Sequence, residues 1–269
     1  MDMKGMNPYQ HFGLRQAWLE HFYNIGLKCF SQDEEDKKYQ VLGYRQYEGL
    51  RAWLRESGLI KIENKSLKET ELLEKIKPYG IYNPYTWAII WANLAYNSVI
   101  SRWYCLHTDL GATYEKADLV TMIGENYSKS TRDNAVTALT ETLRDSPIGS
   151  FLKQGIPLEL TKNTFSYYRE GWDYPSAVAL LYALYLYAEH TGRKTFSFTE
   201  LINARKNPDS KGISPHDIYG IDAKAFREQV QGLATTYPEY IRVSFVANLD
   251  NIILGDYSSN DIVELEEKD

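Results

Sequence analysis

Two short stretches of this sequence combine basic side chains with tyrosine, serine or threonine at the spacing of a helix surface. The first, LGYRQYEGLRAWLRESGLIKIE (42–63), contains Tyr44, Arg45, Tyr47, Arg51 and Arg55. The second, near the start of another expected helix, contains Lys129, Ser130, Thr131 and Arg132. Guanidinium, ammonium and hydroxyl groups commonly contact the phosphates and base edges of DNA. Both stretches are therefore candidate DNA-binding sites, with Ser130, Thr131 and Arg132 at a helix N-terminus that suits a phosphate.

The same residues allow two other interpretations. Tyrosine and arginine also dominate the hot spots of protein–protein interfaces. A charged helix face can also be exposed to solvent without binding any partner. The sequence leaves these interpretations open.

The elements that must position the first stretch can be predicted from its apolar residues. Leu50, Trp53 and Leu54 predict an amphipathic helix, and Gly58 is placed to end it. The next residues, 59–63, alternate as a half-buried strand does. Helix, glycine, strand and polar turn is the order found in a winged helix-turn-helix.

The rest of the chain predicts a mainly α-helical fold with small β-hairpins, in the α+β class, with winged helix-turn-helix-like modules around a central buried helix. That helix is expected over residues 85–105, which are apolar on nearly every side. The other expected elements are a first helix over 8–30, a wing tip or short helix over 65–76, a second helix-turn-helix over 119–126 and 128–145, a third apolar helix over 174–191, and two strands over 240–254 about a turn at 247–250.

These elements predict three modules and a tail. The first comprises residues 1–80, the second residues 81–160 and the third residues 161–257. The acidic tail, residues 258–269, and the acidic stretch 31–38 are expected to be solvated and mobile.

The amino-acid composition limits the kinds of function that this protein can have. The chain has 269 residues, of which 43% are apolar, so it can bury a full core. Its 36 acidic and 30 basic residues give a net charge of −6, so any DNA-binding surface must be a local patch. The sequence predicts neither a signal peptide nor a membrane span, and Cys29 and Cys105 are expected to be buried, reduced thiols of a cytoplasmic protein.

Few residues have the pattern of a catalytic site. The common phosphate-loop, dinucleotide-binding and serine-hydrolase motifs do not occur, and the five histidines are scattered. Asp109, Asp118 and Glu125 fall near one another in sequence and could hold Mg²⁺, although such carboxylates are usually a solvated face. We therefore expect no cofactor, with Mg²⁺ only if these residues support nuclease activity.

Five segments resemble the bacterial domain-of-unknown-function 4007 family in order and approximate spacing. They are FGLRQAWL (12–19), LGYRQYEGLRAWLRESGLI (42–60), NPYTWAIIWANL (83–94), SRWY (101–104) and STRDNAVTAL (130–139). Members of that family are encoded beside a cysteine desulfurase, a sulfurtransferase resembling phosphoadenosine phosphosulfate reductase, and an ATPase. The resemblance implies a role in phosphorothioation-type DNA modification and phage defence, in which at least one relative nicks DNA.

Two departures from the family pattern remove carboxylates. The family commonly has His-Glu-x-Phe before its first helix, where this chain has Gln10, His11 and Phe12. Its Asp-Pro-Tyr is Asn83, Pro84 and Tyr85 here. Neutral amides hold a divalent cation weakly, so the resemblance favours DNA recognition over catalysis in this chain.

Three hypotheses follow. The first is a DNA-binding or target-recognition subunit of a modification or anti-phage defence complex, whose partners are duplex DNA and the sulfurtransferase, desulfurase or ATPase. The second is a metal-dependent DNA-nicking endonuclease. The third is an adaptor that binds the sulfurtransferase or ATPase without contacting DNA. None of them involves a membrane.

Overall fold

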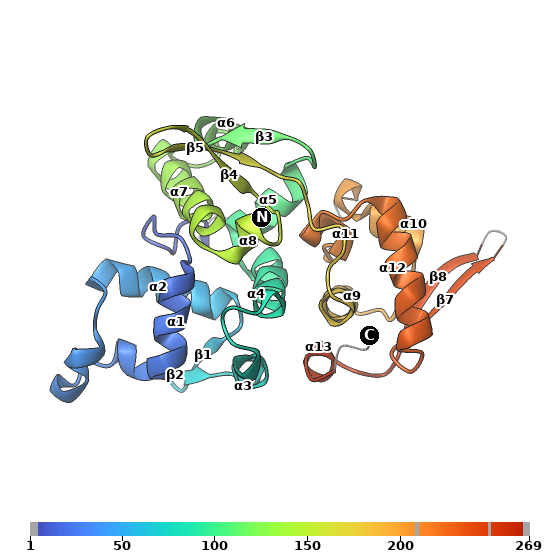
Figure 1. The fold of residues 1–269 in the computed structure, drawn as a ribbon, viewed down its shortest axis with the longest axis horizontal. Coiled ribbons are helices and arrows are strands. Elements are labelled where there is room, and N and C mark those ends of the chain that lie inside the picture. Colours follow the sequence, from blue (N-terminus) through green and yellow to red (C-terminus); the bar gives the residue numbers. More distant parts are fainter. Residues whose placement is uncertain (1–4, 208–209, 247–248, 266–269) are drawn as a thin grey trace.

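Helix α4 (Pro84–Asn97) lies at the centre of the computed structural model, which describes residues 5–207, 210–246 and 249–265. Every residue from Tyr85 to Ala95 is buried, and the other units surround the helix (Figure 1). Asn83 caps it by accepting the N–H of Tyr85 at 3.0 Å, and Pro84 suits the first helical position. The expected central buried helix is confirmed.

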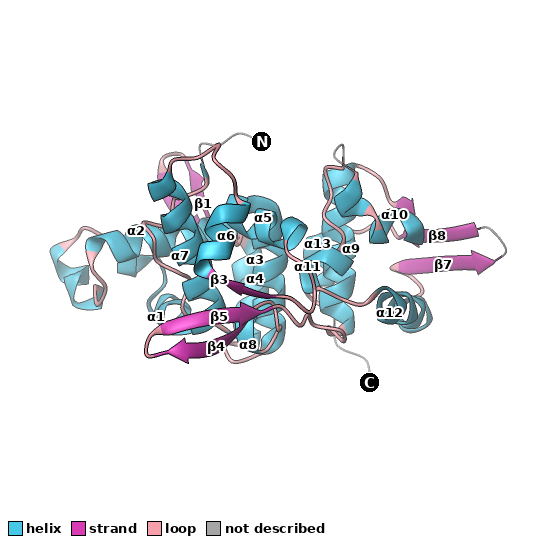
Figure 2. Cartoon of the chain, turned by 90° about the horizontal axis from the view of Figure 1, so that it is seen from above, coloured by secondary structure: helices cyan, strands magenta, loops and turns pink. Residues whose placement is uncertain are grey.

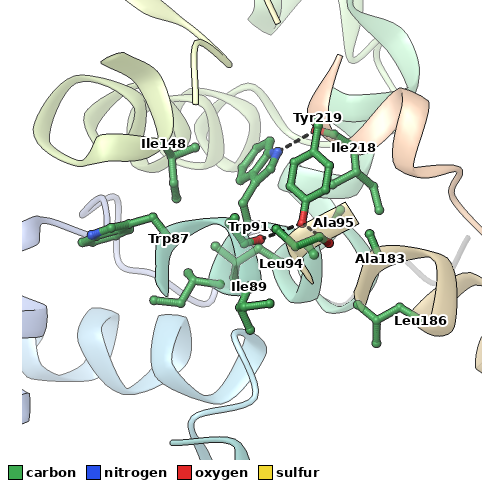
Figure 3. Packing of buried hydrophobic residues seen from close by; sticks show 14 of the residues in the cluster. Trp87, Ile89, Trp91, Leu94, Ala95, Ile148, Ala183, Leu186, Ile218 and Tyr219 are labelled. Atoms are coloured by element: carbon green, nitrogen blue, oxygen red, sulfur yellow. Dashed lines mark hydrogen bonds between the residues drawn. The ribbon is translucent and has the colours of Figure 1, made fainter. Parts of the chain in front are cut away.

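The polar groups of this buried helix bond to distant parts of the chain. Trp91 Nε1 donates to the carbonyl of Ile218 at 2.8 Å, and the Tyr219 hydroxyl donates to the carbonyl of Ala88 at 3.2 Å (Figure 3). Asn93 Nδ2 donates to the Tyr182 hydroxyl at 2.8 Å. Because buried polar groups must find such partners, these bonds hold the C-terminal third of the protein against α4.

The single helix predicted over 85–105 is divided into α4 and α5 (Val99–His107). Ser98 has the extended angles φ −92° and ψ 120°, and its hydroxyl accepts the N–H of Ser101 at 3.3 Å, which caps α5. Apolar residues continue on both sides of the break, so hydrophobic periodicity could not locate it. Serine is a preferred N-cap residue, so Ser98 was the sequence signal that a new helix begins here.

The N-terminal unit contains α1 (Gln16–Ile25), α2 (Tyr44–Glu56), a hairpin of β1 (Ile60–Glu63) and β2 (Ser66–Glu69), and α3 (Glu71–Ile76). Gly58 has φ +76°, and its N–H donates to the carbonyl of Arg55 at 3.1 Å, which confirms it as the residue that ends α2. The first helix is shorter than predicted. Gly13 lies before it and packs on α7, where a Cβ atom would come within 2.4 Å of the Thr142 nitrogen.

The middle unit follows α5 with β3 (Thr113–Glu115), α6 (Lys116–Met122), α7 (Lys129–Asp145), α8 (Pro147–Ser150), β4 (Ile156–Thr161) and β5 (Thr164–Tyr168). Its antiparallel sheet has the strand order β3-β5-β4. The sequence predicted the helices but not this hairpin. Since β5 pairs with β3, the middle unit extends beyond the boundary expected at residue 160.

The C-terminal unit repeats this order with α9 (Ala177–Thr191), β6 (Thr195–Ser197), α10 (Phe198–Ile202), α12 (Ala223–Thr236), β7 (Ile241–Val246) and β8 (Leu249–Leu254). A further helix, α11 (Pro215–Tyr219), is inserted before α12. The strand order β6-β8-β7 matches that of the middle unit. Figure 2 shows this closing hairpin at one end of the molecule and α2 toward the other. Part of the turn expected at 247–250 lies outside the described residues.

The segment after the last hairpin is not the solvated tail that the sequence predicted. Helix α13 (Ser259–Ile262) packs on α9, and Ile262 and Val263 are fully buried. Lys75 of α3 donates to the carbonyl of Asn260 at 3.0 Å, and Ser259 donates its N–H to the Glu189 carboxylate at 2.6 Å. Residues 258–265 therefore connect the N-terminal and C-terminal units, and residues 266–269 lie outside the described part. Within the described residues, no helix combines the length and hydrophobicity needed to cross a membrane.

A half-buried carboxyl group at the end of α2 gives the stability of the fold a pH dependence. Tyr9 is fully buried, stacks on Trp53 with ring centroids 3.8 Å apart, and donates its hydroxyl hydrogen bond to Glu56. Burial raises the pKa of Glu56 to about 7, although the hydrogen bond from Tyr9 and the charge of Arg55 oppose this rise. The folded protein therefore holds a proton that the unfolded chain releases above pH of about 4.3.

We predict that Glu56→Gln raises the melting temperature at pH 8 and has little effect at pH 4. The contribution of Glu56 is fully present below pH of about 4.3 and is lost between that pH and about 7, because over this range the unfolded chain releases the proton that the native state keeps. A gain of 1 kcal/mol corresponds to roughly 2–4 °C for a chain of this size. Thermal unfolding followed by circular dichroism measures it, with the exposed Glu35→Gln as control. An equal shift at both pH values would contradict the assignment.

Candidate nucleic-acid interface

Helices α6 and α7 meet through a short turn that leaves the start of α7 open to solvent. Gly124 has φ +79° in this turn, and its N–H donates to the carbonyl of Thr121 at 3.0 Å. Ser128 caps α7 by accepting the N–H of Thr131 at 3.2 Å. The expected pair of helices is therefore present.

The four predicted residues at the start of α7 divide into two kinds. Lys129 and Ser130 are exposed, whereas Thr131 and Arg132 are half-buried. Arg132 Nη1 lies 3.5 Å from the carbonyl of Val120, so this side chain also contacts α6. The unpaired backbone N–H groups and partial positive charge of a helix N-terminus favour a phosphate at this position.

Residues near the N-terminus cover the other end of α7. The N–H of Leu14 donates to Thr142 Oγ1 at 2.8 Å, and Arg15 forms an ion pair with Glu141 at 2.9 Å. These contacts fix α7 against the N-terminal unit. Only its first turns remain available to a large ligand such as DNA.

The hairpin β4–β5 lies in the same unit as this helix end and was missed by sequence reasoning. Its turn contains Lys162, which is exposed, and Asn163, which has φ +66°. The sequence signal for a hairpin was present in IPLELTKNTFSYY (156–168), where alternating apolar and polar residues flank a Lys-Asn turn. The hairpin adds an exposed cation to the middle unit.

The predicted residues of α2 do not form one surface. Tyr44, Arg45 and Arg55 are exposed, while Arg51 is partly exposed and forms an ion pair with Glu48 one turn earlier. Tyr47 is only 8% exposed. Its hydroxyl accepts the N–H of Val41 at 2.9 Å and donates to the carbonyl of Tyr39 at 3.1 Å. Tyr47 is therefore not on the exposed face of α2 from which the sequence predicted a DNA contact, and its side chain fastens the preceding loop to the helix.

The three carboxylates considered for a metal site have separate environments. Asp109 pairs with Arg205 at 2.9 Å, Asp118 accepts the N–H of Glu115 at 2.8 Å, and Glu125 is exposed in the turn before α7. Among the described residues, no group of three or more His, Cys, Asp or Glu side chains is arranged to hold a metal ion. Asn83 uses its side-chain oxygen to cap α4.

The two cysteines are buried and unpaired, as the sequence predicted. Burial raises the pKa of both the Cys29 and the Cys105 thiol to about 12. Since the thiolate is the reactive form, neither side chain has the properties of a nucleophile or metal ligand in this structure.

We predict that Tyr47→Phe lowers the free energy of unfolding by about 1 kcal/mol, because it leaves the N–H of Val41 and the carbonyl of Tyr39 without their partner. Urea denaturation measures this loss. Tyr44→Phe is the matched control on the same helix, since Tyr44 is 78% exposed, and it should leave stability unchanged. Equal stability of the two variants would show that the Tyr47 hydroxyl does not hold the loop.

Comparison with known proteins shows a likeness of fold. No protein-family model and no curated protein sequence matches the chain. A crystal structure of magnesium ion-bound SspB matches with a TM-score of 0.70 and 15% sequence identity, covering 95% of this chain and 84% of that chain. A second SspB crystal structure matches with a TM-score of 0.69 and 16% identity over the same shares of the two chains. This chain is thus similar in fold to SspB along nearly its whole length.

Proposed function

We propose that this protein binds duplex DNA through its middle unit and serves as a DNA-recognition subunit of a phosphorothioation-linked modification or anti-phage defence complex. The observation that carries the proposal is the α6–α7 pair, with the first turn of α7 exposed and the hairpin β4–β5 in the same unit. In a helix-turn-helix, the N-terminal residues of the second helix are those that contact base edges.

The order of elements supports treating the middle and C-terminal units as winged helices. In each, a helix and a short strand precede two helices and a hairpin, and the first strand pairs with the last one. In the C-terminal unit, the arginine in the second turn of the corresponding helix is engaged within the protein. Arg227 of α12 forms an ion pair with Asp250 at 2.8 Å and lies over the ring of Phe198.

The biological setting in the proposal has two supports. SspB is a phosphorothioation-associated protein, and the present chain is similar to it in fold. The sequence segments described above resemble a family encoded beside a desulfurase, a sulfurtransferase and an ATPase. Those three proteins are accordingly the partners we propose for this chain.

A second candidate function is metal-dependent nicking of DNA, which the bound magnesium ion of the SspB crystal structure favours. The carboxylates first considered for this role lie in different environments, as described. Incubation with supercoiled plasmid and Mg²⁺ tests it directly. Open circles whose formation is abolished by Asp118→Ala or Glu125→Ala would favour nicking over recognition alone.

We predict that Lys129→Ala combined with Lys162→Ala weakens duplex binding roughly tenfold at low salt and reduces the salt dependence. Each lost phosphate contact should reduce the slope of log K against log salt concentration by about 0.9. Fluorescence anisotropy with a labelled duplex at several salt concentrations measures both effects. Lys77→Ala, an exposed lysine of the N-terminal unit, is the control. Unchanged affinity in the double variant would contradict the proposed surface.

Helix α2 provides a separate test. If its exposed arginines extend the DNA-binding surface, Arg45→Ala combined with Arg55→Ala should weaken duplex binding severalfold, because two phosphate contacts are lost. The same anisotropy titration measures it. Normal DNA affinity, together with loss of co-purification with the sulfurtransferase or ATPase, would instead assign α2 to protein binding.

A further inference from the structure

A pocket of about 310 Å³ lies between the middle and C-terminal units. Its charged and polar lining comes from four separate segments of the chain and comprises Asp109, Arg169, Arg205, Lys206, His216 and Asp217. This volume is at the lower end of the range of about 300–1,000 Å³ that small-molecule sites occupy. The pocket is thus large enough for one small ligand and too small for a duplex.

Arg169 provides a fixed cation at the base of this pocket. The side chain is 1% exposed, and its Nη1 donates to the carbonyl and hydroxyl oxygens of Thr108 at 2.7 and 2.8 Å. Its Nη2 donates to the backbone carbonyl of Asp217 at 2.8 Å. A buried guanidinium held by these oxygens is fixed in place and gives the base of the pocket a positive charge.

Asp217 provides an acceptor whose hydrogen bonds are incomplete. The residue is 5% exposed, and its Oδ2 atom is buried without a hydrogen-bond partner among the described residues. Leaving such a group unsatisfied destabilises the folded state. Burial raises the pKa of Asp217 to about 7, although the charges of Arg205 and Arg169 oppose this rise. A ligand that brings N–H donors to Asp217 would satisfy the buried oxygen and favour the ionised carboxylate.

His216 adds a second acceptor to the lining. Its Nδ1 lies 2.5 Å from the carbonyl of Ile221, which fixes the proton on this nitrogen and leaves Nε2 with its lone pair. Burial lowers the pKa of His216, which favours this neutral form. The interior therefore offers two acceptors next to the cation of Arg169.

The outer part of the pocket carries more positive than negative charge. Arg205 and Lys206 are exposed, and Arg205 is paired with Asp109 at 2.9 Å. Lys206 Nζ donates only to the side-chain oxygen of Asn203, at 3.0 Å, among the described residues. A complementary ligand therefore has N–H donors at one end and an anionic group at the other.

We propose that this pocket binds one nucleotide, with the N–H edge of the base against Asp217 and the phosphate against Arg205 and Lys206. Guanine has two adjacent donors, N1–H and N2–H, that match the two oxygens of a carboxylate. Thymine has a single N–H between two carbonyl oxygens, which a carboxylate repels. The site thus discriminates in favour of guanine and against thymine, and it is separate from the duplex-binding surface proposed for α7.

Isothermal titration calorimetry with the four deoxynucleoside monophosphates and with inorganic phosphate tests the proposal. We expect dGMP to bind most tightly, dTMP roughly tenfold or more weakly, and inorganic phosphate to bind weakest. Asp217→Asn should remove most of the preference for dGMP, because an amide retains one acceptor only. Lys206→Ala should weaken dGMP but not deoxyguanosine, and Glu228→Gln on the exposed face of α12 is the control.

Two sources have this chemistry, a free mononucleotide and an unpaired nucleotide within a DNA strand. Single-stranded oligonucleotides of guanine or thymine distinguish them, and binding that needs the oligonucleotide assigns the site to DNA. The proposal would be overturned if the protein bound neither the mononucleotide nor the oligonucleotide. It would also be overturned if dGMP and dTMP bound with equal affinity and neither Asp217→Asn nor Lys206→Ala changed that affinity. Lys129→Ala with Lys162→Ala should retain dGMP binding, so failure of the duplex-binding surface and failure of this site are separable.

Discussion

The structure depends on satisfying the polar groups of a helix that has no exposed side. Helix α4 is buried along its length, so the indole N–H of Trp91 and the amide of Asn93 cannot bond to water. Their partners are Ile218 and Tyr182, both in the C-terminal third of the chain. A displacement of that part that breaks these bonds while water stays excluded would leave both buried donors unpaired, at about 1–3 kcal/mol each. The surrounding units are therefore held in fixed positions, and this fixes the pocket between two of them.

The middle and C-terminal units show how one backbone plan supports different surfaces. Both have the same order of strands in their sheets and a similar order of helices, apart from α8 in the middle unit and α11 in the C-terminal unit. In the middle unit the first turn of α7 is open, whereas Arg227 of α12 is tied to Asp250. The C-terminal unit instead packs on α4 and contributes Arg205, Lys206 and Asp217 to the pocket. Similar elements thus serve recognition in one unit, as proposed, and packing in the other.

The sequence correctly predicted those elements that depend on neighbouring residues alone. The amphipathic pattern of α2 with Gly58 and the burial of α4 were both predicted correctly. Tyr47 was expected on the exposed face of α2 but is buried, because its hydroxyl bonds to the preceding loop. The hydrophobic periodicity of the helix carries no information about that loop. The pocket could not be predicted, because Arg169 and Asp217 lie far apart in sequence and only the packing of two units brings them together. The packed segment after β8 was missed for the same reason.

That segment also determines when the fold can be completed during synthesis. Helix α13 joins α3 and α9 through Lys75 and Glu189, and it leaves the ribosome after all the elements that it connects. Until then, the apolar surface that Ile262 and Val263 cover is exposed on the nascent chain. Such surface favours aggregation and recruits chaperones. A ribosome that stalls before this segment would therefore release a product that has its helices but remains a target for quality control.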